Sequence, residues 1–112
     1  MTARASGNRL VRELHDYLVE RGLWAQREHL HGAFDRGDET LPRLSLTIEV
    51  KRHQKDNLTE FWRQTERERD RNGHRFAAIV HKRWGKGKIE DQWVTMDLKT
   101  FVEIMLDLQE KG

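Results

Sequence analysis

The sequence LSLTIEVK, residues 44–51, determines how this chain is expected to fold. Apolar residues stand at every even position and polar residues at every odd one, which is the two-residue period of a β-strand with one buried face. The side chains of Thr47, Glu49 and Lys51 therefore project together from the polar face. The strand thus presents a carboxylate and a lysine side by side.

The segments on either side of this strand alternate between helical and extended patterns. Apolar residues at helical spacing predict helices over 6–21, 57–72 and from Asp97 onward, with Ser6, Asn57 and Asp97 as N-caps and glycines 22 and 73 at the ends of the first two. Further strands are expected at 24–30, around 33–35, at 76–80 and at 92–96, and the run at 76–80 is typical of a strand covered on both faces. The order α-β-β-β-α-β-β-α predicts an α/β fold with helices packed on a mixed sheet.

Length and composition exclude several classes of protein. The chain has 112 residues, so we expect one domain spanning 1–112, because two cores of half that size would be marginal. It has no cysteine, which excludes disulfide scaffolds, thiolate zinc sites and cysteine nucleophiles. No apolar run approaches the ~20 residues of a membrane span, and the first residues do not resemble a secretory signal. A soluble, cytoplasmic protein without membrane partners is expected.

Basic residues are concentrated in the middle of the chain. Residues 51–88 hold 12 basic and 5 acidic residues, whereas the whole chain has a net charge of only +2. A local positive field attracts polyanions, of which nucleic acid is the commonest. The alternative is a solvated charged helix, because acidic and basic residues alternate through residues 66–71.

The strand at 44–51 is preceded by a second carboxylate in a Gly-Asp turn, Asp38. Two carboxylates and a lysine at one strand end suit metal-assisted phosphodiester hydrolysis, because carboxylates are the hard oxygen ligands that Mg²⁺ or Mn²⁺ requires. A lysine on the same strand face as Glu49 can orient the attacking water or stabilise developing negative charge. The same pattern also fits a solvated strand face with a Glu–Lys ion pair.

Several basic segments are expected to contact DNA phosphates. In the loop 83–88, glycines allow the backbone to approach closely and Trp84 can stack on a base, although an ordinary solvated hairpin is the alternative. Other cations directly follow predicted strands or begin the first helix. The expected DNA-contacting residues are Arg9, Arg52, Lys55, Lys82, Arg83, Lys86 and Lys88.

Some residues have two interpretations from sequence alone. Glu13 lies four residues after Arg9, so an ordinary ion pair along the helix is as plausible as a role in the site. The aromatic and apolar residues Phe61, Trp62, Phe101 and Met105 either fill the core or bury a dimer interface.

Five segments together resemble a known family: GNRLVRE at 7–13, RGD at 36–38, IEVK at 48–51, Gln64, and AIVHK at 78–82. Over roughly residues 7–110 the chain is similar to the PD-(D/E)xK nucleases. It looks most like the small Holliday junction resolvases of archaea and the related resolvase-like nucleases of phages.

The resemblance implies a restriction-endonuclease-like core, Mg²⁺ or Mn²⁺ as cofactor, and a symmetric homodimer that cuts branched DNA such as a four-way junction. It implies metal ligation by Asp38, Glu49 and the Val50 carbonyl, with Lys51 as the catalytic lysine. Glu13 would lie close to the metal or its waters, and Gln64 would help to hold the active site.

The sequence departs from the family where Glu39 and Thr40 follow the Gly-Asp pair, a place where an apolar residue is usual. Asp35 or Glu39 could therefore take or share the role of Asp38. Two other functions also remain open. One is a nuclease of another specificity, such as a nickase, a flap cutter or a restriction-like enzyme. The other is a noncatalytic DNA-binding module on the same fold.

Overall fold

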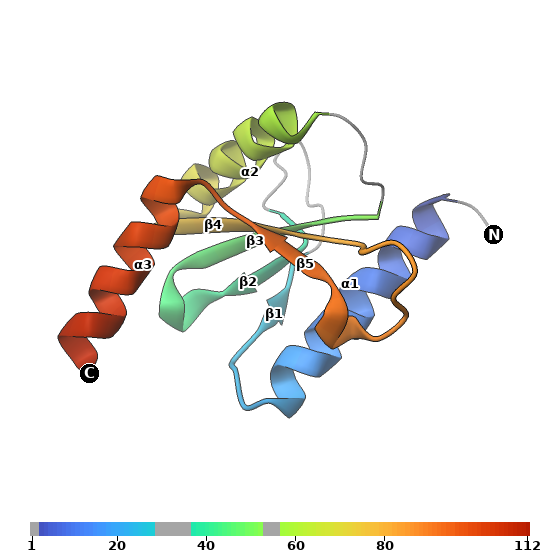
Figure 1. Ribbon diagram of the computed structural model, residues 1–112, viewed down its shortest axis with the longest axis horizontal. Coiled ribbons are helices and arrows are strands. Elements are labelled where there is room, and N and C mark those ends of the chain that lie inside the picture. Colours follow the sequence, from blue (N-terminus) through green and yellow to red (C-terminus); the bar gives the residue numbers. More distant parts are fainter. Residues whose placement is uncertain (1–2, 29–36, 53–56) are drawn as a thin grey trace.

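In a computed structural model, the chain is an α/β structure with a five-stranded mixed sheet and three α-helices (Figure 1). The structure describes residues 3–28, 37–52 and 57–112, and for residues 3–8 the backbone alone. In chain order the elements are α1 (Ala3–Glu20), β1 (Gln26–Arg27), β2 (Glu39–Leu41), the 3₁₀ turn η1 (Pro42–Leu44), β3 (Leu46–Lys51), α2 (Leu58–Asn72), β4 (Phe76–His81), the 3₁₀ turn η2 (Ile89–Asp91), β5 (Trp93–Thr95) and α3 (Leu98–Lys111). The described elements follow the order α-β-β-β-α-β-β-α, although the second of these strands, Glu39–Leu41, was not among those predicted.

The sheet has the order β1-β2-β3-β4-β5, so consecutive strands are neighbours throughout. Only β3 and β4 run parallel; the other pairs are antiparallel. A parallel pair needs a crossover connection, and α2 supplies it. The register places Lys51 beside His81, so both side chains project from the same face of the sheet.

Helices cover β3 from both sides. On one face, Leu10 and Leu14 of α1 pack against Ile48 and Val50 in the main apolar cluster. On the other face, α2 lies across β3 and β4, opposite α1 (Figure 1). The odd-numbered face of β3 is therefore buried as well, and Thr47 is fully buried. The prediction of one buried face was wrong because the strand's own period does not reveal a helix that covers its polar side.

Element boundaries follow the capping signals only in part. Gly22 and Gly73 adopt left-handed φ angles of 96° and 69° at the ends of α1 and α2, as expected. Asp97 accepts a hydrogen bond from the Thr100 amide at 2.9 Å and caps α3. However, α1 begins at Ala3, so Ser6 lies inside the helix rather than at its N-cap.

β1 is shorter than predicted, and β2 is a strand that was not predicted. β1 spans only two residues of the expected 24–30 segment, and the strand expected around 33–35 lies outside the described residues. The second strand of the sheet is instead Glu39–Leu41, which pairs with β3. Within the described ranges, no helix is both long and apolar enough to cross a membrane.

Candidate active site

Lys51 and Glu49 lie on the face of β3 that α2 covers. Glu49 is only 5% exposed. The Lys51 ammonium nitrogen lies 4.0 Å from Glu49 Oε1 and donates a hydrogen bond to Gln64 Oε1 of α2 at 3.3 Å. It also lies 4.7 Å from the centre of the Phe61 ring. The lysine is therefore held in one orientation by groups from both β3 and α2.

Asp38 is anchored to the end of β3 by two backbone contacts. Its amide donates to the Ile48 carbonyl at 3.1 Å, and its carboxylate Oδ2 accepts from the Val50 amide at 2.7 Å. The amide and carbonyl of one strand residue point to the same side, so the Val50 carbonyl is directed toward the edge that holds Asp38. The structure thus brings Asp38, Glu49 and Lys51 to one end of β3.

Gly37 allows Asp38 to lie close against β3. Its φ of 89° is left-handed, and a Cβ there would lie 3.0 Å from Thr47 Cγ2 and 3.2 Å from the Ile48 carbonyl oxygen. Any other residue would be strained at this φ and would press against β3. The glycine therefore lets the chain carry Asp38 close against the strand.

Glu68 of α2 is a residue that the sequence interpretation missed. It is fully buried, and its Oε2 lies 3.7 Å from the position a Cβ would take at Gly37. Burial, together with the neighbouring carboxyls of Glu68 and Asp38, raises the pKa of Glu49 to about 12. Crowded, buried carboxyl groups of this kind are typical of functional sites.

A sequence signal for Glu68 was available. It stands three residues after Thr65 and seven after Phe61, which are positions on one side of a helix. Thr65 is also fully buried, so this side of α2 faces the sheet. The alternating charges of residues 66–71 favoured a solvated helix, but only part of that run faces solvent.

The site offers oxygen donors of the type that a hard divalent cation requires. Oε2 of Glu49 is buried and accepts no hydrogen bond from the described residues. Asp38 and the Val50 carbonyl lie at the same strand end, and Mg²⁺ usually takes only one or two protein carboxylates. Among the described residues, no three histidine or acidic side chains form a ready-made metal cluster. The donor set therefore fits a cation held by Asp38, Glu49 and a backbone carbonyl, with water in the remaining positions.

Glu39 does not join this site. The register pairs it with Ile48, so it projects from the α1 face, opposite Glu49. There it is fully buried, and its Oε1 lies 2.9 Å from His15 Nδ1. Burial raises the pKa of Glu39, although the bond to His15 opposes this shift. The suggestion that Glu39 shares the role of Asp38 was therefore wrong, and Asp35 lies outside the described residues.

Glu13 and three of the expected DNA-contacting cations come together in one pocket. The pocket has a volume of about 190 Å³ and is lined by Arg9, Leu10, Glu13, Arg52, Lys82, Gly87 and Gln92. It collects cations from α1, from the residue after β3 and from the residue after β4. Glu13 lies 3.9 Å from Arg9, so the ion pair expected from their spacing is present.

The loop from 82 to 92 is organised by Gln92. Its side chain accepts from the Arg83 amide at 2.7 Å and donates to the carbonyls of Lys86 and Lys88 at 3.0 and 2.6 Å. The Arg83 guanidinium stacks over the Trp93 ring at 4.3 Å. This network leaves the side chains of Lys86 and Lys88 exposed on the loop. Lys55 lies outside the described residues.

His81 stands next to Lys51 on the same sheet face. Its Nε2 lies 2.6 Å from the Thr95 hydroxyl. Burial lowers the pKa of this histidine, which favours the neutral ring.

No family model, curated protein or solved structure significantly matches this chain. The assignment of function therefore depends on the residues themselves.

Proposed function

We propose that this chain is a metal-dependent DNA endonuclease with a PD-(D/E)xK, restriction-endonuclease-like core. One observation carries the proposal: Asp38, Glu49 and Lys51 meet at one end of β3, beneath α2. The alternative of a solvated ion pair would leave Glu49 in water. Instead, Glu49 is buried beside other carboxyls, an arrangement that is costly unless a cation or a reaction makes use of it.

In this proposal, Asp38, Glu49 and the Val50 carbonyl hold Mg²⁺ or Mn²⁺. Such a cation supplies charge neutralisation at the phosphate and activation of the water that attacks it. Lys51 donates a hydrogen bond to a phosphate oxygen or to the attacking water. Gln64 keeps the ammonium group in place by accepting its hydrogen bond. Glu68 is a positioning residue, because its buried carboxyl lies beside that of Glu49.

The DNA backbone is held by cations around the site. Arg9, Arg52 and Lys82 line the basic pocket, and the loop stabilised by Gln92 presents Arg83, Lys86 and Lys88. Branched DNA, such as a four-way junction, is the proposed substrate. A nuclease of another specificity is distinguished from a resolvase only by its choice of substrate.

The test is cleavage of a labelled four-way junction with Mg²⁺ or Mn²⁺, with linear duplex as a second substrate. Wild type is compared with Lys51→Ala and with Lys111→Ala, which removes an exposed lysine from α3. Symmetric cuts that Lys51→Ala loses and Lys111→Ala keeps are the expected result. Equal cleavage of both DNAs would support a nuclease but contradict the proposed specificity for junctions. Cleavage by Lys51→Ala at the wild-type rate would contradict the proposed active site.

A noncatalytic DNA-binding module is the second candidate. It is favoured by one observation, that Arg9, Arg52 and Lys82 line one pocket, because such cations bind DNA phosphates without a metal. Binding of the junction at low salt without cleavage in Mg²⁺ or Mn²⁺, by folded protein, would support this function instead.

A further inference from the structure

Three side chains stand in one row across the end of the sheet. The register pairs Lys51 of β3 with His81 of β4, and His81 with Trp93 of β5. Directly paired residues project from the same face of a sheet, so all three lie on the face that holds Glu49. Neighbouring strands are about 4.8 Å apart, which puts the backbone of Trp93 about 10 Å from that of Lys51. The row therefore leads from the active site to a large aromatic ring.

Trp93 is held in place and is also open to solvent. The Arg83 guanidinium lies 4.3 Å from the centre of the ring, and Trp93 is 44% exposed. The preceding residue, Gln92, makes three hydrogen bonds to the backbone of the loop before β5. In the middle of the row, His81 Nε2 lies 2.6 Å from the Thr95 hydroxyl. An aromatic ring on such a fixed support needs little ordering before it binds a flat partner.

The chemistry of this ring and its neighbour fits a nucleobase. Bases stack on aromatic side chains, and a guanidinium beside the ring adds a cation–π contribution. The positive charge of Arg83 also attracts the phosphate that accompanies each base. A base inside a duplex has its faces covered by its neighbours, so it must leave the stack before a protein ring can contact it. The partner that fits Trp93 is therefore an unpaired base.

We infer that Trp93 and Arg83 form a stacking site for one unpaired DNA base on the strand that the active site cuts. This inference rests on the proposed function, because that function supplies the DNA and the phosphate at Lys51. A duplex strand rises 3.4 Å per nucleotide, so a span of about 10 Å corresponds to about three nucleotides, and an extended strand covers it in fewer. The stacked base lies within about three nucleotides of the cleaved phosphate. The site thus favours DNA with an unpaired nucleotide there, as at a flap or an opened branch point.

Trp84 is a second exposed tryptophan near these strand ends. The sequence offers it for base stacking, and it is 90% exposed in the loop after β4. The loop does not pair with β3 or β4, so no strand register places Trp84 in line with Lys51. Trp93 has that register and the supporting guanidinium of Arg83. The structure therefore favours Trp93, and Trp84→Ala enters the test to separate the two rings.

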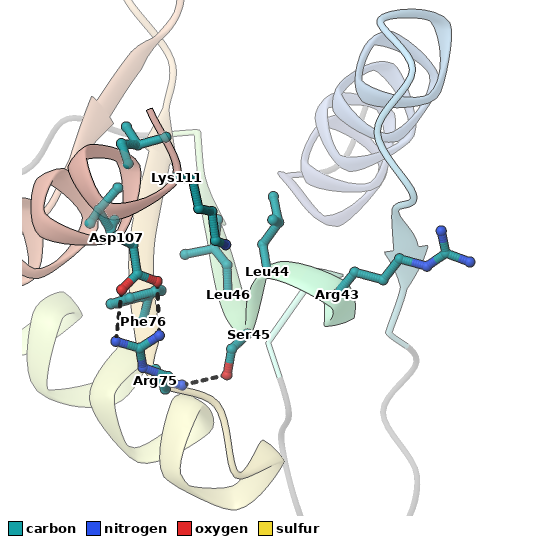
Figure 2. Close-up of a pocket in the computed structure, with 10 residues that line it drawn as sticks. Arg43, Leu44, Ser45, Leu46, Arg75, Phe76, Asp107 and Lys111 are labelled. Atoms are coloured by element: carbon teal, nitrogen blue, oxygen red, sulfur yellow. Dashed lines mark hydrogen bonds and ion pairs between the residues drawn. The ribbon is translucent and has the colours of Figure 1, made fainter.

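Trp24 supplies a matched control at the opposite end of β3. The Arg43 guanidinium lies 3.9 Å from the centre of its ring, and Trp24 is 58% exposed, so this pair resembles the stack of Arg83 on Trp93. Figure 2 shows Arg43 on the turn that enters β3, pointing away from the helix that carries Asp107. Lys51 is the last residue of the same strand. The length of β3 therefore separates the control pair from the active site.

The first test is fluorescence anisotropy at low salt, in a chelating buffer that prevents cleavage. The probes are a duplex with a short single-stranded flap and the same duplex without it. Trp93→Ala should weaken flap binding about 10-fold and duplex binding less than about 2-fold, because one stacked base is lost. Trp93→Phe should keep most of the flap affinity, and Trp24→Ala should bind both DNAs as wild type does. An equal loss on both DNAs, or no loss on the flap, would overturn the inference.

The position of the base is tested with 2-aminopurine, a fluorescent base analogue whose emission is quenched when it stacks on tryptophan. The analogue is placed in the flap at successive distances from the branch. Wild type should quench it most strongly over a window of about three nucleotides, and Trp93→Ala should not. Quenching that Trp93→Ala keeps and Trp84→Ala removes would overturn the assignment to Trp93. Circular dichroism of each variant checks that it is folded.

Cleavage of the same flap DNA in Mg²⁺ or Mn²⁺ separates this inference from the proposed function. If wild type cleaves the flap and Trp93→Ala keeps full flap affinity, the nuclease is supported and the stacking site is contradicted. If wild type binds the flap selectively through Trp93 but does not cleave it, the stacking site is supported and the nuclease is contradicted. A folded wild type that binds neither DNA would overturn both.

Discussion

Replacing Glu49 with glutamine is expected to abolish cleavage and, at the same time, to stabilise the metal-free fold at neutral pH. Glu49 is 5% exposed, and its carboxyl stands beside two other carboxyls. Without a cation, this group is more easily buried as a neutral acid than as a carboxylate. Glutamine has nearly the same shape and is neutral at every pH, so it removes the electrostatic cost while it keeps the packing.

The magnitude follows from proton linkage. Burial and the neighbouring carboxyls raise the pKa of Glu49 from 4.5 to about 12. Between these values the folded protein holds a proton that the unfolded chain releases, so the free energy of unfolding falls by about 1.4 kcal/mol per pH unit. The stabilising effect of this protonation is complete below pH 4.5 and declines as the pH rises. At pH 7, Glu49 therefore lowers the stability of the metal-free protein by about 3 kcal/mol relative to acid conditions.

The assay is urea unfolding in a chelating buffer, at several pH values between about 5 and about 8, for wild type and Glu49→Gln. The difference in stability between the two proteins should increase with pH in favour of the variant. Glu60→Gln, a change at an exposed position of α2, is the matched control and should follow wild type. Adding Mg²⁺ or Mn²⁺ should stabilise wild type and not Glu49→Gln. Parallel pH profiles for wild type and Glu49→Gln would refute the reasoning, because they would show that Glu49 ionises freely in the folded protein.

Three further changes probe the fold and the DNA surface. Gly37→Ala should lower the free energy of unfolding by about 1–3 kcal/mol through its left-handed φ and its contact with β3. Gly85→Ala, at a φ of 80° with nothing described within 4 Å of a Cβ, should cost less in the same denaturant titration. Asp97→Ala removes the cap at Thr100 and should cost about 1 kcal/mol, measured by thermal unfolding; a variant as stable as wild type would contradict this cap. Arg52→Ala should weaken junction binding and reduce the salt slope by about 1 in fluorescence anisotropy, and an unchanged slope would remove Arg52 from the phosphate contacts.

Local patterns in the sequence were sufficient to predict most of the elements. The alternation over 44–51 and the helical spacing on either side of it record which residues share a face, and a shared face is a property of the local backbone. For this reason the prediction was correct for the strand face that Glu49 shares with Lys51, for the Asp97 cap, and for the glycines that end α1 and α2. β1 was predicted in the right place but too long, and β2 was not predicted, because strands of two or three residues contain too little periodicity to show their bounds.

The composition of the site shows where local patterns become insufficient. Glu49 and Glu39 are both glutamates on strands, and both are buried. Glu49 faces α2 and the carboxyl of Glu68, whereas Glu39 faces α1 and His15. The register of β2 against β3 decides which of the two glutamates lies on the same sheet face as the active site. Register depends on contacts between segments distant in sequence. Glu68 joins the site for the same reason, since α2 must first cross the sheet.

The sequence by itself determined the helices, the central strand and the sharing of one strand face by a carboxylate and a lysine. Those features depend on backbone geometry within a few residues. Only the tertiary structure decided that this face is buried, that Glu68 lies beside Glu49, that Glu39 turns to His15, and that α3 presents its apolar side to solvent. Periodicity defines the faces of an element, but the elements packed against it decide which face loses its water.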